Sequence, residues 1–126
     1  QVLITAPLEQ AMTAAEALGR TADGRAAEPL ITLLEDEDCD VREGAARALI
    51  LIGPAAVEPL TATLNHDEWD VRRAAAVLLG TIGDPHAVEG LFVSCGDEDA
   101  DVRKAASDAL MRIGLKWKTS PPTDQD

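Results

Sequence analysis

Two Asp-x-Asp-x-Asp stretches, residues 36–40 and 97–101, are the first candidates for chemistry in this chain. The calcium loop of an EF-hand begins with three carboxylates at alternate positions, and it continues with Gly at its sixth position and Glu at its twelfth. Here valine occupies the sixth position of both stretches, and Arg47 and Asp108 occupy the twelfth. We therefore expect no metal site, and we interpret these aspartates as turn-forming and helix-capping residues.

An Asp-Val-Arg triplet occurs three times, and its valines at 41, 71 and 102 lie 30 and 31 residues apart. A period in this range is typical of a repeat array. If the units stack, the charged members of the triplets would form a structural ladder, with each guanidinium near a carboxylate of its own or the neighbouring unit. The ladder residues are Asp40, Arg42, Asp70, Arg72, Asp101 and Arg103. Capture of a ligand by exposed arginines is the alternative.

Residue types that build catalytic sites are scarce. The chain has two histidines and contains no HExxH, GxSxG, P-loop or dinucleotide-binding motif. Its two cysteines show no metal-ligand spacing, and Cys95 aligns with leucines of the other units, as a small buried residue would. We expect a protein that is not an enzyme and that uses no cofactor.

The charge balance restricts the class of partner. The 126 residues carry 11 basic and 23 acidic side chains, so the net charge of −12 repels phosphate backbones and we expect no nucleic-acid binding. No apolar run reaches the roughly 18 residues of a membrane span, and we expect no signal peptide. We expect no membrane contact and a cytoplasmic location. Because the chain begins with Gln1, we also expect an excised or processed piece of a longer protein.

The elements that must position the charged residues are pairs of helices. In the second segment of each unit, apolar residues recur at offsets of 0, 4, 7, 8 and 11, which mark one face of an α-helix. In the first unit they are Val41, Ala45, Ala48, Leu49 and Ile52, with equivalents within 71–82 and 102–113. Each of these helices is followed by a glycine, where a helix end favours left-handed backbone: Gly53, Gly83 and Gly114.

A shorter first helix precedes each of these, over 26–35, 55–65 and 86–95. We expect Asp38 and Asp99 to cap the second helices, with Glu68 as a weaker cap. The resulting divisions are a partial N-terminal repeat or cap at 1–22, repeat 1 at 23–53, repeat 2 at 54–83, repeat 3 at 84–114 and a flexible polar tail at 115–126.

The unit signature resembles HEAT repeats, most closely the short variety named for phycobilisome lyases. It is carried by Asp38-Cys39-Asp40-Val41-Arg42, by Val57-Glu58-Pro59-Leu60 and by the Leu-Gly-Thr-Ile-Gly-Asp-Pro run at 79–85, within about residues 7–114. The resemblance implies an all-α fold, a right-handed α-solenoid of antiparallel helix pairs with about three and a half repeats. It also implies that first helices lie on the convex face and second helices on the concave face.

One branch of this family, the deoxyhypusine hydroxylases, uses His-Glu pairs as iron ligands. Here His66 is followed by Asp67 and His86 by Ala87, so the sequence argues against that activity.

A surface for a partner is predicted opposite the buried stripe of the second helices, where charged and apolar residues alternate. These positions are Glu43, Arg47 and Ile50, then Arg73, Val77 and Gly80, then Lys104, Asp108 and Met111. Trp69 stands in a turn where the other units have Cys39 and Ala100, so it is either an interface anchor or a cover for a neighbouring turn. With the exception of Gly80, we take all of these as candidate partner-binding residues.

The turns between the paired helices hold 12 of the 23 acidic residues, which would line one edge of a stacked array as an acidic ridge. They are Glu35, Asp36, Glu37, Asp38, Asp40, Asp67, Glu68, Asp70, Asp97, Glu98, Asp99 and Asp101. The ridge serves either solubility or attraction of a basic partner.

The function that we infer is a noncatalytic scaffold that binds a partner protein or peptide on the concave helix face. The expected partner has a basic surface. The alternatives are a bilin lyase-like or pigment-handling subunit, suggested by the repeat variety alone, and a nucleic-acid-binding module, which the net charge disfavours.

Overall fold

The structure, a computed structural model, describes residues 27–119, with side chains up to residue 116. The predicted N-terminal cap at 1–22, the residues after 119 and the side chain of Trp117 lie outside this description.

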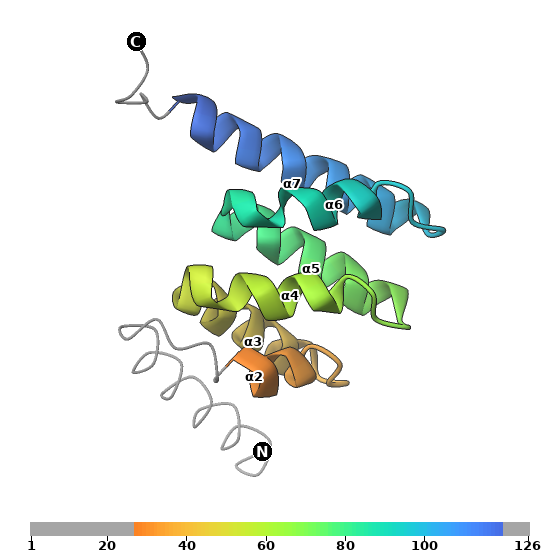
Figure 1. Cartoon of the computed structure of the whole chain (residues 1–126). Helices are drawn as coiled ribbons and strands as arrows, with labels where there is room; N and C mark the ends of the chain where they lie inside the picture. The colour runs from red at the N-terminus through yellow and green to blue at the C-terminus, as the bar shows by residue number, and fades with distance from the viewer. Residues whose placement is uncertain (1–26, 120–126) are drawn as a thin grey trace.

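Within residues 27–119, six α-helices form three consecutive pairs. The first helices are α2 (Ala27–Leu33), α4 (Val57–Thr63) and α6 (Val88–Ser94), and the second helices are α3 (Cys39–Ile52), α5 (Trp69–Ile82) and α7 (Ala100–Thr119). Short 3₁₀ helices, η2 (Gly53–Ala56) and η3 (Pro85–Ala87), join one pair to the next. Figure 1 shows the pairs stacked in chain order, with α2, α4 and α6 in one layer and α3, α5 and α7 in the other. This is the predicted all-α solenoid; we call the exposed side of α3, α5 and α7 the second-helix face.

The predicted apolar stripe forms the core. In α3 the buried residues are those at the five predicted offsets, from Val41 to Ile52. The first helices contribute one fully buried leucine each, Leu30, Leu60 and Leu91. Because each unit buries its apolar stripe against its own first helix and its neighbours, the core runs continuously through the stack.

The helix starts follow the predicted capping. The Oδ1 atom of Asp38 accepts the backbone N–H of Asp40 at 2.8 Å. The Oδ1 atom of Asp99 accepts the N–H of Asp101 at 2.8 Å. Glu68 makes no side-chain cap bond at the start of α5, which agrees with its prediction as the weaker cap.

The helix ends differ between units. Gly53 and Gly83 have φ of 70° and 77° and end α3 and α5 as predicted. Gly114 does not end its helix, because α7 continues to Thr119. The predicted tail therefore begins too early, since residues 115–119 are helical. In the first two units proline follows the glycine within two residues, whereas two helix formers follow Gly114 and Lys116 donates to the carbonyl of Ile82 at 3.3 Å.

One stretch of the described residues, 39–63, is long and apolar enough by length and composition alone to cross a membrane. It is divided, however, into α3, η2 and α4, and Gly53 at the first junction has a positive φ of 70°. Its large apolar side chains Leu49 and Leu60 are fully buried in the core. Packing of the stack therefore accounts for part of the apolar character of this stretch, whereas Leu51 remains exposed.

Among the described helices, the most extensive contact between units joins α5 to α7. A Cβ atom added to Gly80 would lie 2.7 Å from both Cα and Cβ of Ala109, so only glycine allows this approach. Ala76 and Ala105 are also buried. The prediction that Gly80 lies on the exposed face is therefore wrong. Its counterparts Ile50 and Met111 are exposed. The prediction failed at Gly80 because helical periodicity locates the buried stripe of a single helix but not the contacts of that helix with the next unit.

Candidate functional site

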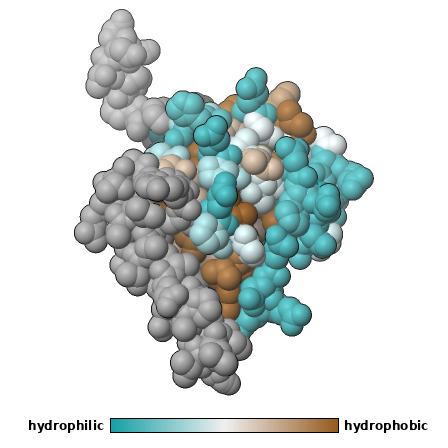
Figure 2. Space-filling view, turned by 60° about the horizontal axis from the view of Figure 1, so that its bottom comes forward, coloured by the Kyte–Doolittle hydropathy of each residue, from teal (hydrophilic) through white to brown (hydrophobic). Residues whose placement is uncertain are grey.

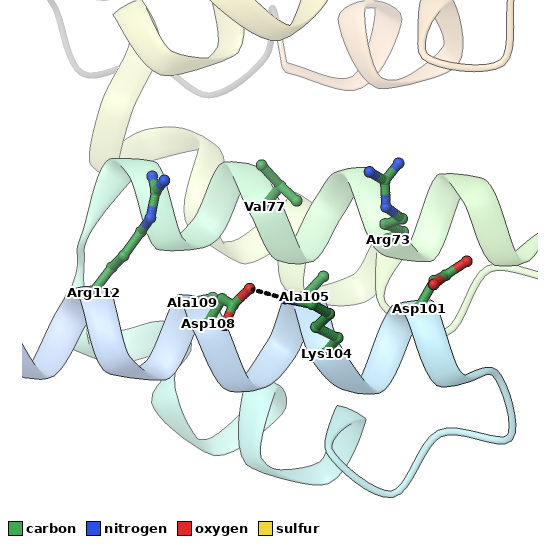
Figure 3. A pocket seen from close by; sticks show the side chains of 8 residues that line it. All are labelled: Arg73, Val77, Asp101, Lys104, Ala105, Asp108, Ala109 and Arg112. Carbon is green, nitrogen blue, oxygen red and sulfur yellow. Dashed lines mark hydrogen bonds and ion pairs between the residues drawn. The ribbon is translucent and has the colours of Figure 1, made fainter.

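A groove of about 340 Å³ lies between α5 and α7 on the second-helix face. It is lined by Arg73, Val77, Asp101, Lys104, Ala105, Asp108, Ala109 and Arg112. Figure 3 shows α5 contributing the first two of these and α7 the other six. Four of the predicted partner-binding residues thus meet in one place: Arg73, Val77, Lys104 and Asp108.

Helical spacing explains how the groove is built. On α5, Arg73 and Val77 are four residues apart and so lie on one face. On α7, Lys104, Asp108 and Arg112 follow one another at the same spacing. The small side chains of Ala105 and Ala109 form the floor, and both are buried. The close approach of α7 to α5 therefore fixes the position of the walls.

The charges in the groove are only partly satisfied. Lys104 Nζ lies 3.4 Å from Asp108 Oδ2, and Arg112 Nη1 donates to Thr81 Oγ1 at 3.4 Å. Among the residues with described side chains, neither the Arg73 guanidinium nor the Asp101 carboxylate has a hydrogen-bond or ion-pair partner. With three cations and two carboxylates, the groove is net positive on a chain whose net charge is −12.

The groove also exposes an apolar side chain. Val77 is 44% exposed and lies between Arg73 and Arg112 along the row drawn in Figure 3. Exposed apolar residues are common singly, but this one is flanked by cations and stands beside a concave surface. The groove thus offers a polypeptide both an apolar contact and charged anchors.

The other predicted partner-binding residues lie outside this groove. Glu43 and Arg47 form an exposed pair on α3, with 3.4 Å between Oε2 and Nη2. Trp69, at the start of α5, and Met111, on α7, are both exposed. Ile50, on α3, is partly exposed. The structure therefore does not bring the nine predicted residues into one site.

Sequence reasoning missed Arg112, Ala105 and Ala109 as groove residues, and it assigned Asp101 only to the charge ladder. A signal for Arg112 was present, because it continues the spacing of four that links Lys104 to Asp108. No periodicity within one helix, however, indicates which residues of α7 face α5.

The predicted charge ladder, with each guanidinium near a carboxylate of its own or the neighbouring unit, forms at Arg72 but not at Arg42 or Arg103. Arg42 Nη1 donates to the backbone carbonyls of Asp36 and Glu37, at 2.6 and 3.2 Å. Arg103 Nη1 does the same with the carbonyls of Asp97 and Glu98, at 2.7 and 3.2 Å. Each arginine therefore ties down the turn of its own unit. Within the described part of the chain, none of these arginines binds the carboxylate of Asp40, Asp70 or Asp101.

Among the described arginines, only Arg72 links two units through a carboxylate. Its Nη1 donates to the carbonyls of His66 and Asp67, at 2.8 and 3.0 Å, as in the other units. In addition, Nε and Nη2 donate to the two oxygens of Asp97, at 2.9 and 3.1 Å. Both side chains of this pair are largely buried. One bidentate bridge thus joins α5 to the turn before α7.

The sequence explains why Arg42 lacks the bridge to the next unit that Arg72 makes. Asp97 is the second residue of its turn, and the equivalent residue of the middle unit is His66. Asp97 Oδ1 accepts the N–H of Asp99 at 2.8 Å, and His66 Nδ1 accepts the N–H of Glu68 at 3.0 Å. Histidine therefore reproduces the turn, but it brings no carboxylate to Arg42.

The bridge shifts the pKa values of both Asp97 and Arg72. Although burial alone would raise the pKa of Asp97, hydrogen bonds from the Arg72 guanidinium and the Asp99 N–H lower it below its ordinary value of 3.8. The hydrogen bond to Asp97 raises the pKa of Arg72 above its ordinary value. The bridge is therefore an ion pair at neutral pH.

The acidic ridge follows one edge of the stack. Figure 1 shows the turns between paired helices on the same side of the molecule, and Figure 2 shows hydrophilic surface gathered on that side. Neighbouring turns make contact, since His66 Nε2 lies 3.2 Å from Glu35 Oε2. No group of three or more potential metal ligands is present among the described residues.

Comparison with known proteins identifies the repeat. A family model described as HEAT repeats matches residues 6–78 and 57–122. The crystal structure of an engineered protein, a structural-genomics target, is similar at 29% identity with a TM-score of 0.50. The match covers 71% of this chain and 46% of that one, so this chain spans less than half the length of the engineered protein. No curated protein matches the chain. The family match does not distinguish the phycobilisome-lyase variety from other HEAT repeats.

Proposed function

Because this chain belongs to the family of HEAT repeats, which are commonly protein-interaction scaffolds, we propose that it is a noncatalytic scaffold that binds a partner protein or peptide on its second-helix face. The contact centres on the groove between α5 and α7. The partner takes the place that water occupies beside Val77, and the charged side chains around it fix the partner's orientation.

The observation that carries this proposal is the combination of exposed Val77 with an Arg73 guanidinium that no described side chain pairs. A guanidinium without a partner is available for a charge-assisted hydrogen bond to a bound polypeptide. The groove is also held in shape by the contact between Gly80 and Ala109. A preformed surface loses less affinity to ordering when the partner binds.

The acidic ridge has a separate part in this function. Its 12 carboxylates at one edge of the stack would attract a partner with a basic surface and raise the rate of encounter. The effect would weaken with salt, because charges on the exposed edge are screened beyond about 8 Å at physiological ionic strength.

The noncatalytic character of the proposal rests on the shape of the groove. Its charged residues Arg73, Lys104 and Asp108 are exposed on an open helix face. General acid–base and electrostatic catalysis gain most where water is excluded, and this surface does not exclude it.

Affinity capture with matched variants tests the proposal. Wild type, Val77→Asp on the second-helix face and Val93→Asp on α6 would be used as baits at moderate salt, since both valines are exposed. A captured protein would then be purified, and its binding to each bait measured by calorimetry. We expect binding to wild type and Val93→Asp, and loss with Val77→Asp. Equal binding to all three baits would refute the assignment of the surface.

A further inference from the structure

We propose that the groove between α5 and α7 binds a short extended acidic segment of the partner, with two carboxylates four residues apart and an apolar residue midway between them. This inference rests on the proposed function and adds the chemistry of the bound segment. The segment bound in the groove is acidic, whereas the net charge of the chain predicts a basic partner.

The local charge favours a carboxylate. Lys104 and Asp108 lie close enough to offset each other, at 3.4 Å. The remaining charges are those of Arg73, Arg112 and Asp101, which leaves an excess of one positive charge in the groove. Arg73 has no partner among the described side chains, and Arg112 makes only the 3.4 Å contact to the hydroxyl of Thr81. Both guanidinium groups can donate hydrogen bonds to a carboxylate without breaking an existing ion pair.

The spacing of the two arginines favours a particular pattern. The contact to Thr81 places the Arg112 guanidinium beside that residue, which follows Arg73 by eight positions on α5. Eight residues of α-helix correspond to about 12 Å along the axis. Val77 lies halfway, four residues from each end. Figure 3 shows this order, with Arg73 and Arg112 at the two ends and Val77 between them.

An extended peptide matches this order. Its residues advance by about 3.3 Å, so residues i and i+4 are about 13 Å apart. Side chains at i, i+2 and i+4 point to the same side of an extended chain. A segment of the form acidic-x-apolar-x-acidic therefore presents two carboxylates to the arginines and an apolar side chain to Val77.

Asp101 gives the proposal a second readout. Its carboxylate has no partner among the described side chains and lies at the Arg73 end of the groove in Figure 3. A bound carboxylate at Arg73 would be repelled by it. Asp101→Asn should therefore tighten the binding of an acidic segment, whereas it should weaken the binding of a basic one.

The test uses labelled synthetic peptides and the full chain. Fluorescence anisotropy would be measured at physiological ionic strength with a Glu-x-Leu-x-Glu peptide, a Lys-x-Leu-x-Lys peptide of the same length, and a peptide with the two glutamates adjacent. The protein variants are Arg73→Glu, Arg112→Glu, Asp101→Asn and the control Arg47→Glu. Arg47 is an exposed arginine on α3, so its reversal changes the net charge equally without touching the groove.

We expect saturable binding of the Glu-x-Leu-x-Glu peptide with weaker binding of the other two. Arg73→Glu and Arg112→Glu should each weaken it by about tenfold or more, and Arg47→Glu by much less. Preference for the adjacent glutamates, equal effects of the three reversals, or absence of saturable binding would overturn the inference.

One outcome separates this inference from the proposed function. If only the basic peptide binds, the groove does not select an acidic segment and the inference fails. The scaffold function would then remain, because it depends on the loss of a purified partner in Val77→Asp and its retention in Val93→Asp.

Discussion

Replacement of Gly80 by alanine tests the packing that builds the groove. The added Cβ would lie 2.7 Å from Cα and Cβ of Ala109, whereas ordinary contacts begin at 3.4 Å. The atoms in the way belong to the backbone and first carbon of α7, so they cannot rotate aside. To restore ordinary contact, α7 must move by about 0.7 Å or more, and overpacking of this kind costs about 1–3 kcal/mol.

A second glycine supplies the matched control. Gly114 lies within α7, as Gly80 lies within α5, and a Cβ added to Gly114 meets nothing within 4 Å. Alanine is better than glycine in a helix interior by about 1 kcal/mol. We therefore expect Gly114→Ala to raise the free energy of unfolding by up to about 1 kcal/mol. Gly80→Ala gains the same preference but bears the clash, so we expect a net loss of up to about 2 kcal/mol.

Urea denaturation followed by far-ultraviolet circular dichroism measures both changes. The slope of the free energy against urea should be the same in both variants, which would show that the extent of unfolding is unchanged. Gly80→Ala should also weaken peptide binding, because the groove walls move apart. If Gly80→Ala stabilises the protein as much as Gly114→Ala does, α5 and α7 do not approach as closely as described, and the groove loses its floor.

Further predictions concern the core, the groove and the bridge. Leu79→Ala removes a fully buried side chain and should lower the free energy of unfolding by about 2–5 kcal/mol in urea denaturation. Val77→Asp should leave it within about 0.5 kcal/mol, because this side chain is partly in solvent. Arg72→Ala should lower the urea midpoint more than Arg42→Ala, since only Arg72 binds a carboxylate of the next unit. The lowered pKa of Asp97 means that its ionised form stabilises the fold above pH 3.8, and this contribution is lost as the pH falls through the folded pKa. Wild type should thus lose stability below pH 4 more steeply than Asp97→Asn.

Most of the fold could be predicted from the sequence because each unit repeats the same pattern of apolar, capping and turn residues. Apolar offsets of 0, 4, 7, 8 and 11 located the buried face of α3 residue by residue. The capping aspartates and the glycines at 53 and 83 located helix boundaries through local hydrogen bonds and backbone preferences. Where a local signal was incomplete, as at Gly114 without a following proline, the boundary prediction was wrong.

Contacts between units were less predictable from the sequence. The spacing that placed Arg73, Val77, Lys104 and Asp108 on exposed faces did not reveal that α5 and α7 would meet at Gly80. A pair of small residues four apart, Ala105 and Ala109, was the available signal for a close helix contact. It says nothing by itself about which helix is the neighbour.

The charged residues show the same limit. Repetition of Asp-Val-Arg predicted equivalent roles for three arginines, and all three do hold the carbonyls of their own turns. The bridge to the next unit depends on a different position, where Asp97 is acidic and His66 is not. The offset between stacked units determines which carboxylate lies beside an arginine. The spacing of residues within one unit does not predict that offset.

The most direct test of the proposed partner surface is a titration of the ¹⁵N-labelled chain with the Glu-x-Leu-x-Glu peptide, followed by amide chemical shifts. We predict shifts confined to α5 and α7, with the largest changes near Arg73, Val77, Ala105 and Arg112. Shifts concentrated in the first helices α2, α4 and α6 or in the acidic turns, or no shifts at saturating peptide, would contradict it.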